Sequence, residues 1–143
     1  MKFSHLVPGD DFSMVGQASA ELKRLLARLG IDPALVKRAS VAMYEGEINM
    51  AIHAGGGMAE AEILPDRITM TLTDCGPGIA DLELAMREGW STAPDVYREL
   101  GFGAGMGLPN MKRNSDEISF ESRLGVGTTV RMVIRLDREG ERA

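Results

Sequence analysis

Apolar residues recur at helical spacing in two consecutive stretches near the start of the chain. The first covers residues 12–29, and the second runs from Asp32 to about His53. Gly30 separates them, and Asp32-Pro33 is a typical helix start, with an N-cap followed by proline at the first helical position. We therefore predict two amphipathic helices. The buried stripe of the second is expected to contain Leu35, Val36, Ala39, Ala42, Met43, Gly46 and Met50.

Elsewhere apolar and polar positions alternate, which is typical of half-buried strands. The predicted strands are residues 3–7, 59–63, 68–72, 118–123 and 128–136. Pro65-Asp66 and residues 124–127 supply the turns of two hairpins. A short helix fits Leu108–Asn114, whereas residues 76–104 are glycine-rich and irregular. Strands joined by short turns, with helices grouped between them, predict an α+β two-layer sandwich rather than alternating βαβ units.

Length and charge narrow the class of protein. With 143 residues, we expect one domain over residues 1–136 and a charged tail over 137–143. The 21 acidic and 16 basic residues give a net charge of −5 without a basic cluster, so we expect no nucleic-acid binding. Cys75 is the only cysteine, which suits a reducing cytoplasm. No apolar run approaches the length of a membrane span, so we expect a soluble cytoplasmic protein without a membrane contact.

A polar stripe borders the buried face of the second helix. Glu45, Asn49 and His53 lie four residues apart and therefore share one side of it. The amide oxygen of Asn49 suits Mg²⁺, which takes few protein ligands, and Glu45 is placed to orient or deprotonate an attacking hydroxyl. The ordinary alternative is a solvated helix face with a capping histidine. Glu47 points about 160° away from Asn49, given about 100° of rotation per helical residue, and is expected to face solvent.

A carboxylate ends the predicted strand 68–72. Asp74 has the parity of Ile68, Met70 and Leu72, so its side chain points to the buried face. An ionised group there needs a partner, and the amino group of adenine is one. Gly76 and Gly78 would let the backbone pass close to a planar base. The alternative is an Asx-turn at a strand end.

A glycine-rich loop precedes the predicted helix at Leu108. Free backbone N–H groups and the helix dipole favour anions at such a place, which makes the loop a candidate phosphate cradle. It lacks the G-K-[ST] ending of a Walker loop and does not fit the dinucleotide spacing, so a flexible hinge is the alternative. The candidate residues are Gly101, Gly103, Ala104, Gly105, Met106, Gly107 and Leu108.

Thr128 completes the set of polar candidates. It shares the parity of Val130 and Met132, so its hydroxyl points to the buried side, where it could reach adenine directly or through water. A β-branched residue after a hairpin turn is the alternative. Together the four segments supply a metal-binding amide, a carboxylate for a base edge, a phosphate loop and a closing hydroxyl. This combination favours an ATP site.

The same four segments resemble the N, G1 and G2 boxes and the terminal glycine-threonine motif of the GHKL superfamily, the Bergerat-fold ATP sites of gyrase, heat-shock chaperones, histidine kinases and MutL. The resemblance spans roughly residues 35–136. The pattern E-x-x-x-N-x-x-x-H at Glu45–His53 and the stretch 105–113 are most similar to anti-sigma-factor serine/threonine kinases and related switch kinases.

The resemblance implies a fold, a lid and residue roles. The fold would be a mixed, mostly antiparallel sheet with helices on one face, and the lid would cover about residues 81–103. Asn49 would hold magnesium, Glu45 would be the catalytic base, and Asp74 would bind the adenine amino group. The other implied nucleotide contacts are His53, Gly76, Gly78, Gly101, Gly103, Ala104, Gly105, Met106, Gly107, Leu108 and Thr128.

The leading hypothesis is a serine/threonine protein kinase of the anti-sigma regulatory type. It would transfer the γ-phosphate of Mg-ATP to a small protein partner, an anti-anti-sigma-like domain, with a sigma factor as a further partner. A second hypothesis is a non-catalytic module in which ATP or ADP sets the lid and the lid selects the partner. A slow ATPase without a protein substrate is a third. Related regulators often form homodimers, although no motif here demonstrates that state.

Overall fold

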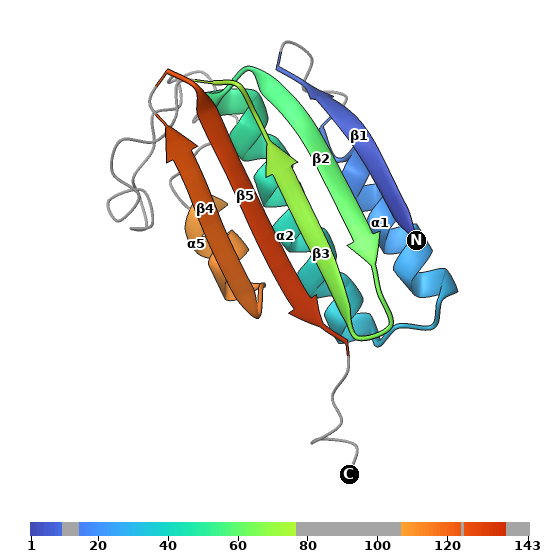
Figure 1. The fold of residues 1–143 in the computed structure, drawn as a ribbon. Coiled ribbons are helices and arrows are strands. Elements are labelled where there is room, and N and C mark those ends of the chain that lie inside the picture. The colour runs from blue at the N-terminus through green and yellow to red at the C-terminus, as the bar shows by residue number, and fades with distance from the viewer. Residues whose placement is uncertain (10–14, 77–106, 124, 137–143) are drawn as a thin grey trace.

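A computed structural model describes residues 1–9, 15–76, 107–123 and 125–136, and the account below concerns these residues (Figure 1). The elements follow the predicted order and nearly the predicted bounds. They are β1 (Lys2–Pro8), α1 (Gln17–Arg28), α2 (Pro33–His53), β2 (Gly56–Ile63), β3 (Arg67–Thr73), α5 (Gly107–Arg113), β4 (Glu117–Arg123) and β5 (Gly127–Arg135).

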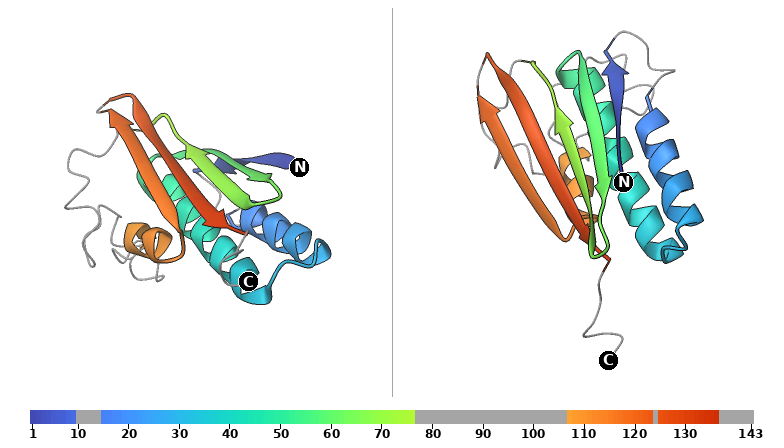
Figure 2. Two further views of the ribbon diagram at one scale, coloured as in Figure 1. Left: turned by 60° about the horizontal axis from the view of Figure 1, so that its bottom comes forward. Right: turned by 45° about the vertical axis from the view of Figure 1, so that its right-hand side comes forward.

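One sheet of five strands carries the described helices on a single face (Figure 2). The strand order is β1-β2-β3-β5-β4, and β2–β3 and β4–β5 are hairpins. This arrangement confirms the α+β two-layer sandwich. All four pairings between the described strands are antiparallel, so this sheet is antiparallel rather than mixed. None of the described helices is long and apolar enough to cross a membrane.

The core lies between the sheet and the helices. Alternate residues of the central strands point into it, including Ile68, Met70 and Leu72 of β3, each at most 1% exposed. All seven residues of the expected α2 stripe are buried. Gly46 brings α2 close to the sheet, because a Cβ atom there would lie 2.5 Å from a methyl carbon of Leu72. Close packing on the sheet therefore fixes the position of α2, the helix that carries the polar stripe.

Helix α1 begins later than the apolar pattern predicts. It starts at Gln17, and Val15 and Gly16 form a turn before it, so the expected helix over residues 12–29 is too long at this end. Gly16 has φ +103°, which is outside the helical region and is a conformation that L side chains rarely adopt. Periodicity alone could not reveal this stop, since glycine interrupts a helix without changing the apolar rhythm.

Glu47 is buried, not exposed as the helical wheel of α2 predicts. It is 1% exposed and accepts hydrogen bonds from the backbone N–H groups of Gly16 at 2.7 Å and Ser19 at 2.8 Å. A longer bond of 3.4 Å comes from the Ala18 N–H. Gly16 has no side chain to cap α1, and Glu47 supplies the cap from the neighbouring helix. The helical wheel of α2 correctly directs the Glu47 side chain away from Asn49. It could not show that α1 packs on that side of α2.

Candidate nucleotide site

The polar stripe of α2 lies at the border of the core. Glu45, Asn49 and His53 are all partly buried, and His53 is the last residue of the helix. Neither a fully solvated face nor a packed core face has this intermediate exposure. Their placement agrees with the predicted border position and leaves the Glu45 and Asn49 side chains within reach of solvent.

Helix α5 contributes the polar neighbours of Glu45. The Asn110 amide donates a hydrogen bond from Nδ2 to Glu45 Oε1 at 3.4 Å, and Arg113 Nη1 donates to Asn110 Oδ1 at 3.0 Å. Burial raises the pKa of the Glu45 carboxyl above its ordinary value, and the hydrogen bond from Asn110 opposes this rise. A carboxylate with a raised pKa is a better proton acceptor near neutral pH.

Sequence reasoning missed Asn110 and Arg113. The apolar pattern predicted their helix, and the three-residue spacing between them places both on one side of it. That side faces α2 only because α5 packs beside α2 in the folded chain. An amide and a guanidinium directly after the glycine-rich loop could have indicated a polar site. The pattern along the chain did not show that Glu45 is the hydrogen-bond partner of Asn110.

Asp74 ties the end of β3 to the start of β5. Its Oδ1 accepts hydrogen bonds from the Gly76 N–H at 2.9 Å and the Thr128 N–H at 3.1 Å. Its own N–H donates to the Thr128 carbonyl at 2.9 Å. The Asx-turn considered as an alternative is therefore present. Both side-chain bonds use Oδ1, and within the described ranges no hydrogen bond is made to Oδ2.

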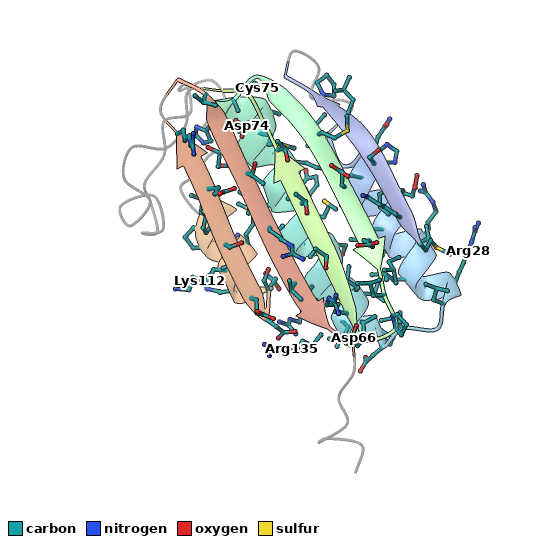
Figure 3. All side chains as sticks on the ribbon, in the orientation of Figure 1. Arg28, Asp66, Asp74, Cys75, Lys112 and Arg135 are labelled. Atoms are coloured by element: carbon teal, nitrogen blue, oxygen red, sulfur yellow. The ribbon has the colours of Figure 1, made fainter. Side chains whose placement is uncertain are left out.

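Two glycines allow the close packing around Asp74. A Cβ atom on Gly76 would lie 2.6 Å from the Cβ of Ala54, the residue that follows α2. Gly127 has φ +143°, and a Cβ atom there would overlap the Asp74 carbonyl oxygen. The turn at Asp74 thereby rests on the C-terminal end of α2 and beside the first residue of β5. Figure 3 shows Asp74 and Cys75 together at this end of the sheet, opposite Asp66 and Arg135.

Thr128 has the predicted orientation. It is 5% exposed, and its hydroxyl shares a 2.9 Å hydrogen bond with the Ser122 hydroxyl on β4. A hydroxyl has one donor and two acceptor positions, so this bond leaves Thr128 capacity for a further partner. Sequence reasoning did not include Ser122, which becomes a neighbour only through the register that pairs it with Thr128.

The glycine-rich segment is described only at its end. Gly107 is the first residue of α5, as expected for a loop that enters a helix, and Leu108 is 5% exposed in the core. The Leu108 side chain is thus a packing residue, and any nucleotide contact would come from its backbone. The candidates Gly78, Gly101, Gly103, Ala104, Gly105 and Met106, and the expected lid at residues 81–103, lie outside the described residues.

The oxygen atoms of α2 fit a sparsely held magnesium ion better than a protein-made metal cage. No group of three or more His, Cys, Asp or Glu side chains that could hold a metal occurs in the part of the chain that the structure describes. Asn49 and Glu45 offer hard oxygen donors one helical turn apart. Mg²⁺ commonly keeps several waters and substrate phosphates and takes one or two protein oxygens, so this donor set fits it.

Comparison with known proteins identifies the family of the chain. Residues 10–134 match the histidine kinase-like ATPase domain family. The chain is 33% identical over 121 residues to the serine/threonine-protein kinase RsbT of Bacillus subtilis (strain 168), covering 81% of this chain and 85% of RsbT. It is 36% identical over 115 residues to an anti-sigma F factor of Caldanaerobacter subterraneus subsp. tengcongensis, covering 76% of this chain and 77% of that protein.

Solved structures show the same fold. The RsbU and RsbW domains of Rv1364c from Mycobacterium tuberculosis align with a TM-score of 0.64 at 16% identity, covering 96% of this chain and 33% of that one. The SiaB–SiaC complex from Pseudomonas aeruginosa aligns with a TM-score of 0.64 at 14% identity, covering 92% and 88%. At such identities the likeness concerns the arrangement of strands and helices.

Proposed function

We propose that this chain, which belongs to the histidine kinase-like ATPase family, is a serine/threonine protein kinase of the anti-sigma regulatory type. One observation carries the proposal. Glu45 is partly buried on α2, one turn from Asn49, and faces the helix that directly follows the glycine-rich segment. A candidate proton acceptor thus contacts the helix that follows the expected phosphate loop in sequence, and a candidate metal-binding amide lies one turn further along α2.

The nucleotide would lie over the end of α2 and the ends of the central strands. Asp74 Oδ2 would accept from the adenine amino group, and Thr128 would contact the base from β5. The turn at Gly76 lies close to Ala54, so there is no space for a side chain at this position. A glycine here would also leave room for the plane of the base. Support comes from the hydrogen bonds that orient Asp74 and from the buried position of Thr128.

Phosphoryl transfer depends mainly on positioning and charge stabilisation. Asn49 would hold Mg²⁺, which when bound neutralises charge on the triphosphate. Glu45 would orient the hydroxyl of the partner's serine or threonine and accept its proton as the oxygen bonds to the γ-phosphorus and ADP leaves. Burial, which raises the Glu45 pKa, supports this role. The partner would be a small anti-anti-sigma-like domain, with a sigma factor as a further binding partner.

Glu45→Gln tests the catalytic assignment. With labelled ATP and a candidate anti-anti-sigma domain, we expect at least a hundred-fold loss of phosphotransfer, the usual range for a general base. Calorimetry should show nearly unchanged Mg-ATP binding, since glutamine has the same shape. Glu121→Gln, on exposed β4 residue Glu121, is the matched control. Absence of transfer by the unaltered protein at every magnesium concentration would refute the kinase assignment.

A second candidate function is a nucleotide-gated binding module without phosphotransfer. The observation that favours it is the similarity to an anti-sigma F factor, a name that states inhibition of a sigma factor and no reaction. In that case Glu45→Gln would leave the capture of the partner unchanged, and ATP and ADP would give different partner affinities. A pull-down in each nucleotide with both proteins separates the two functions.

A further inference from the structure

Two neighbouring hollows lie along the line where α1 packs against α2, and Glu45 lines one of them. One part has a volume of about 520 Å³ and is lined by Lys23, Ala27, Ile31, Val36, Lys37 and Ser40, among others. The adjoining part has a volume of about 360 Å³, and its lining includes Ala20, Lys23, Ser40, Val41, Tyr44 and Glu45. Because Lys23 and Ser40 line both parts, we treat them as one feature, the α1–α2 groove.

The groove changes character along its length. Ala27, Ile31 and Val36 make one end apolar. Lys23 and Lys37 are both exposed; Lys23 lines both parts, whereas Lys37 lines the larger part beside Val36. In the described ranges neither lysine forms an ion pair, although the chain as a whole carries a net charge of −5. Two exposed cations that pair with no acidic group of the described residues, next to an apolar pocket and near a candidate proton acceptor, are complementary to an acidic peptide segment.

We propose that the α1–α2 groove docks the phosphoacceptor segment of the protein substrate as an extended, acidic stretch of chain. An apolar side chain occupies the Ile31–Val36 end, acidic side chains meet Lys23 and Lys37, and the acceptor hydroxyl reaches Glu45. This assignment rests on the proposed kinase function for Glu45. It adds what the catalytic site alone does not specify, namely the chemistry of the segment that is phosphorylated.

Helix geometry sets the spacing within that segment. Val36 and Glu45 are separated along α2 by about 14 Å, given a rise of 1.5 Å per residue. An extended chain advances about 3.3 Å per residue, so about four residues span this distance. The apolar anchor therefore lies about four residues from the phosphorylated serine or threonine, with the acidic residues between them.

Labelled synthetic peptides test the groove directly. The acidic probe has leucine four residues from a serine with glutamates between them, made in both chain directions, and the basic probe has lysines in place of the glutamates. Fluorescence anisotropy with the full chain should show that one acidic peptide binds at least ten-fold more tightly than its basic counterpart. Equal affinity for both, or no binding of either acidic peptide at millimolar concentration, would overturn the proposal.

Charge reversal in the protein supplies the matched comparison. Lys23→Glu with Lys37→Glu should weaken the acidic peptide at least ten-fold and strengthen the basic one, whereas Arg24→Glu, on the same helix but outside the groove, should change neither. Lys23→Gln with Lys37→Gln is the milder pair if the reversed pair folds poorly by circular dichroism. In phosphotransfer to a protein partner, the double variant should raise KM and leave kcat unchanged.

The two proposals fail differently. Peptide binding that responds to both lysines, without any phosphotransfer, would retain the groove and remove the kinase function. Phosphotransfer whose KM ignores Lys23 and Lys37 would retain the kinase and remove the groove.

Discussion

Helix α2 packs against both α1 and α5, and two of its carboxyl groups differ sharply in burial and hydrogen bonding. On the α1 side, Glu47 is 1% exposed and accepts two short backbone hydrogen bonds of 2.7 and 2.8 Å. Glu45, which lines the α1–α2 groove and also contacts α5, is only partly buried and accepts one long bond of 3.4 Å from Asn110. Thus, of two glutamates two residues apart, Glu47 has hydrogen bonds to both carboxylate oxygens, whereas Glu45 has one long hydrogen bond to a single oxygen. The first is suited to hold helices together, and the second remains available for a reaction.

The largest stability effect is expected at Glu47. Replacing Glu47 by Ala leaves the N-terminal N–H groups of α1 without their acceptor and opens a cavity, so we expect a loss of about 2–4 kcal/mol in the free energy of unfolding. Urea unfolding followed by circular dichroism measures it. Glu47→Gln, which keeps one acceptor oxygen, should lose less, and Glu121→Ala on the surface should change little. A loss below about 1 kcal/mol would contradict the capping role, given the usual strength of a helix cap.

Asp116 makes its contacts on the α5 side of α2. It follows α5, accepts from Arg38 of α2 at 3.1 Å and from the Arg135 N–H at 2.7 Å. Burial alone would raise the pKa of Asp116, but these hydrogen bonds and the positive charges of Arg38 and Arg135 lower it below 3.8. Asp116→Ala should cost about 1–2 kcal/mol, since bonds to a charged group are strong but this site is partly exposed.

The pH dependence at Asp116 has a definite sign. A carboxyl whose pKa is lower in the folded state stabilises the protein above the unfolded pKa and loses this effect as pH falls through the folded value. The difference between Asp116→Ala and the unaltered protein should therefore be greatest near neutral pH and shrink below pH 3.8. A difference that grows in acid would contradict the assignment.

Glu45 should show the opposite sign. The pKa of the Glu45 carboxyl in the folded protein is raised above the ordinary 4.5. At pH values between 4.5 and this higher folded pKa, the unfolded chain has lost the proton that the folded protein retains. Stability therefore falls as pH rises through this window, and Glu45→Gln should unfold at slightly higher urea concentration than the unaltered protein at pH 7. The gain should disappear below pH 4.5. Destabilisation at pH 7 would indicate that Glu45 holds the fold instead.

The smallest effect is expected at Asn110. Removing its side chain takes away the hydrogen bond that lowers the Glu45 pKa. If the kinase assignment holds, Asn110→Ala should move the acid limb of the kcat/KM profile to higher pH and leave the rate at high pH nearly unchanged. Lys112→Gln, an exposed change on the same helix, is the control. A uniform loss of rate at every pH would mean that Asn110 acts only on structure.

Much of the fold and part of the site could be predicted from local patterns. Asp32-Pro33 marked the start of α2, since a side-chain acceptor and a fixed φ act within one turn, and the Asp32 carboxylate does accept from the Ala34 N–H at 2.9 Å. Strand parity placed Asp74 and Thr128 on the helix side of the sheet. The nucleotide roles of these residues, and of Gly78 and the glycine-rich segment, stay predictions.

Properties that depend on two distant segments could not be predicted in this way. A helical wheel gives the direction of Glu47 but not the presence of α1 there. Likewise, the sequence indicated Leu108 as a nucleotide contact and did not show that its side chain packs in the core. Asp74 was interpreted as either an Asx-turn or a base-binding group. The structure shows the turn, which Asp74 Oδ1 makes with the Gly76 N–H, and the base-binding role stays a prediction.

By itself, the sequence determined the order of the helices and strands, the start of α2, the apolar faces of the strands and the border position of the polar stripe on α2, because those features arise from interactions within a few residues. Only the tertiary structure decided that Glu47 would cap another helix, that Asn110 would meet Glu45 and that two lysines would line one groove. These depend on how α1 and α5 pack against α2, and packing brings together side chains that are tens of residues apart.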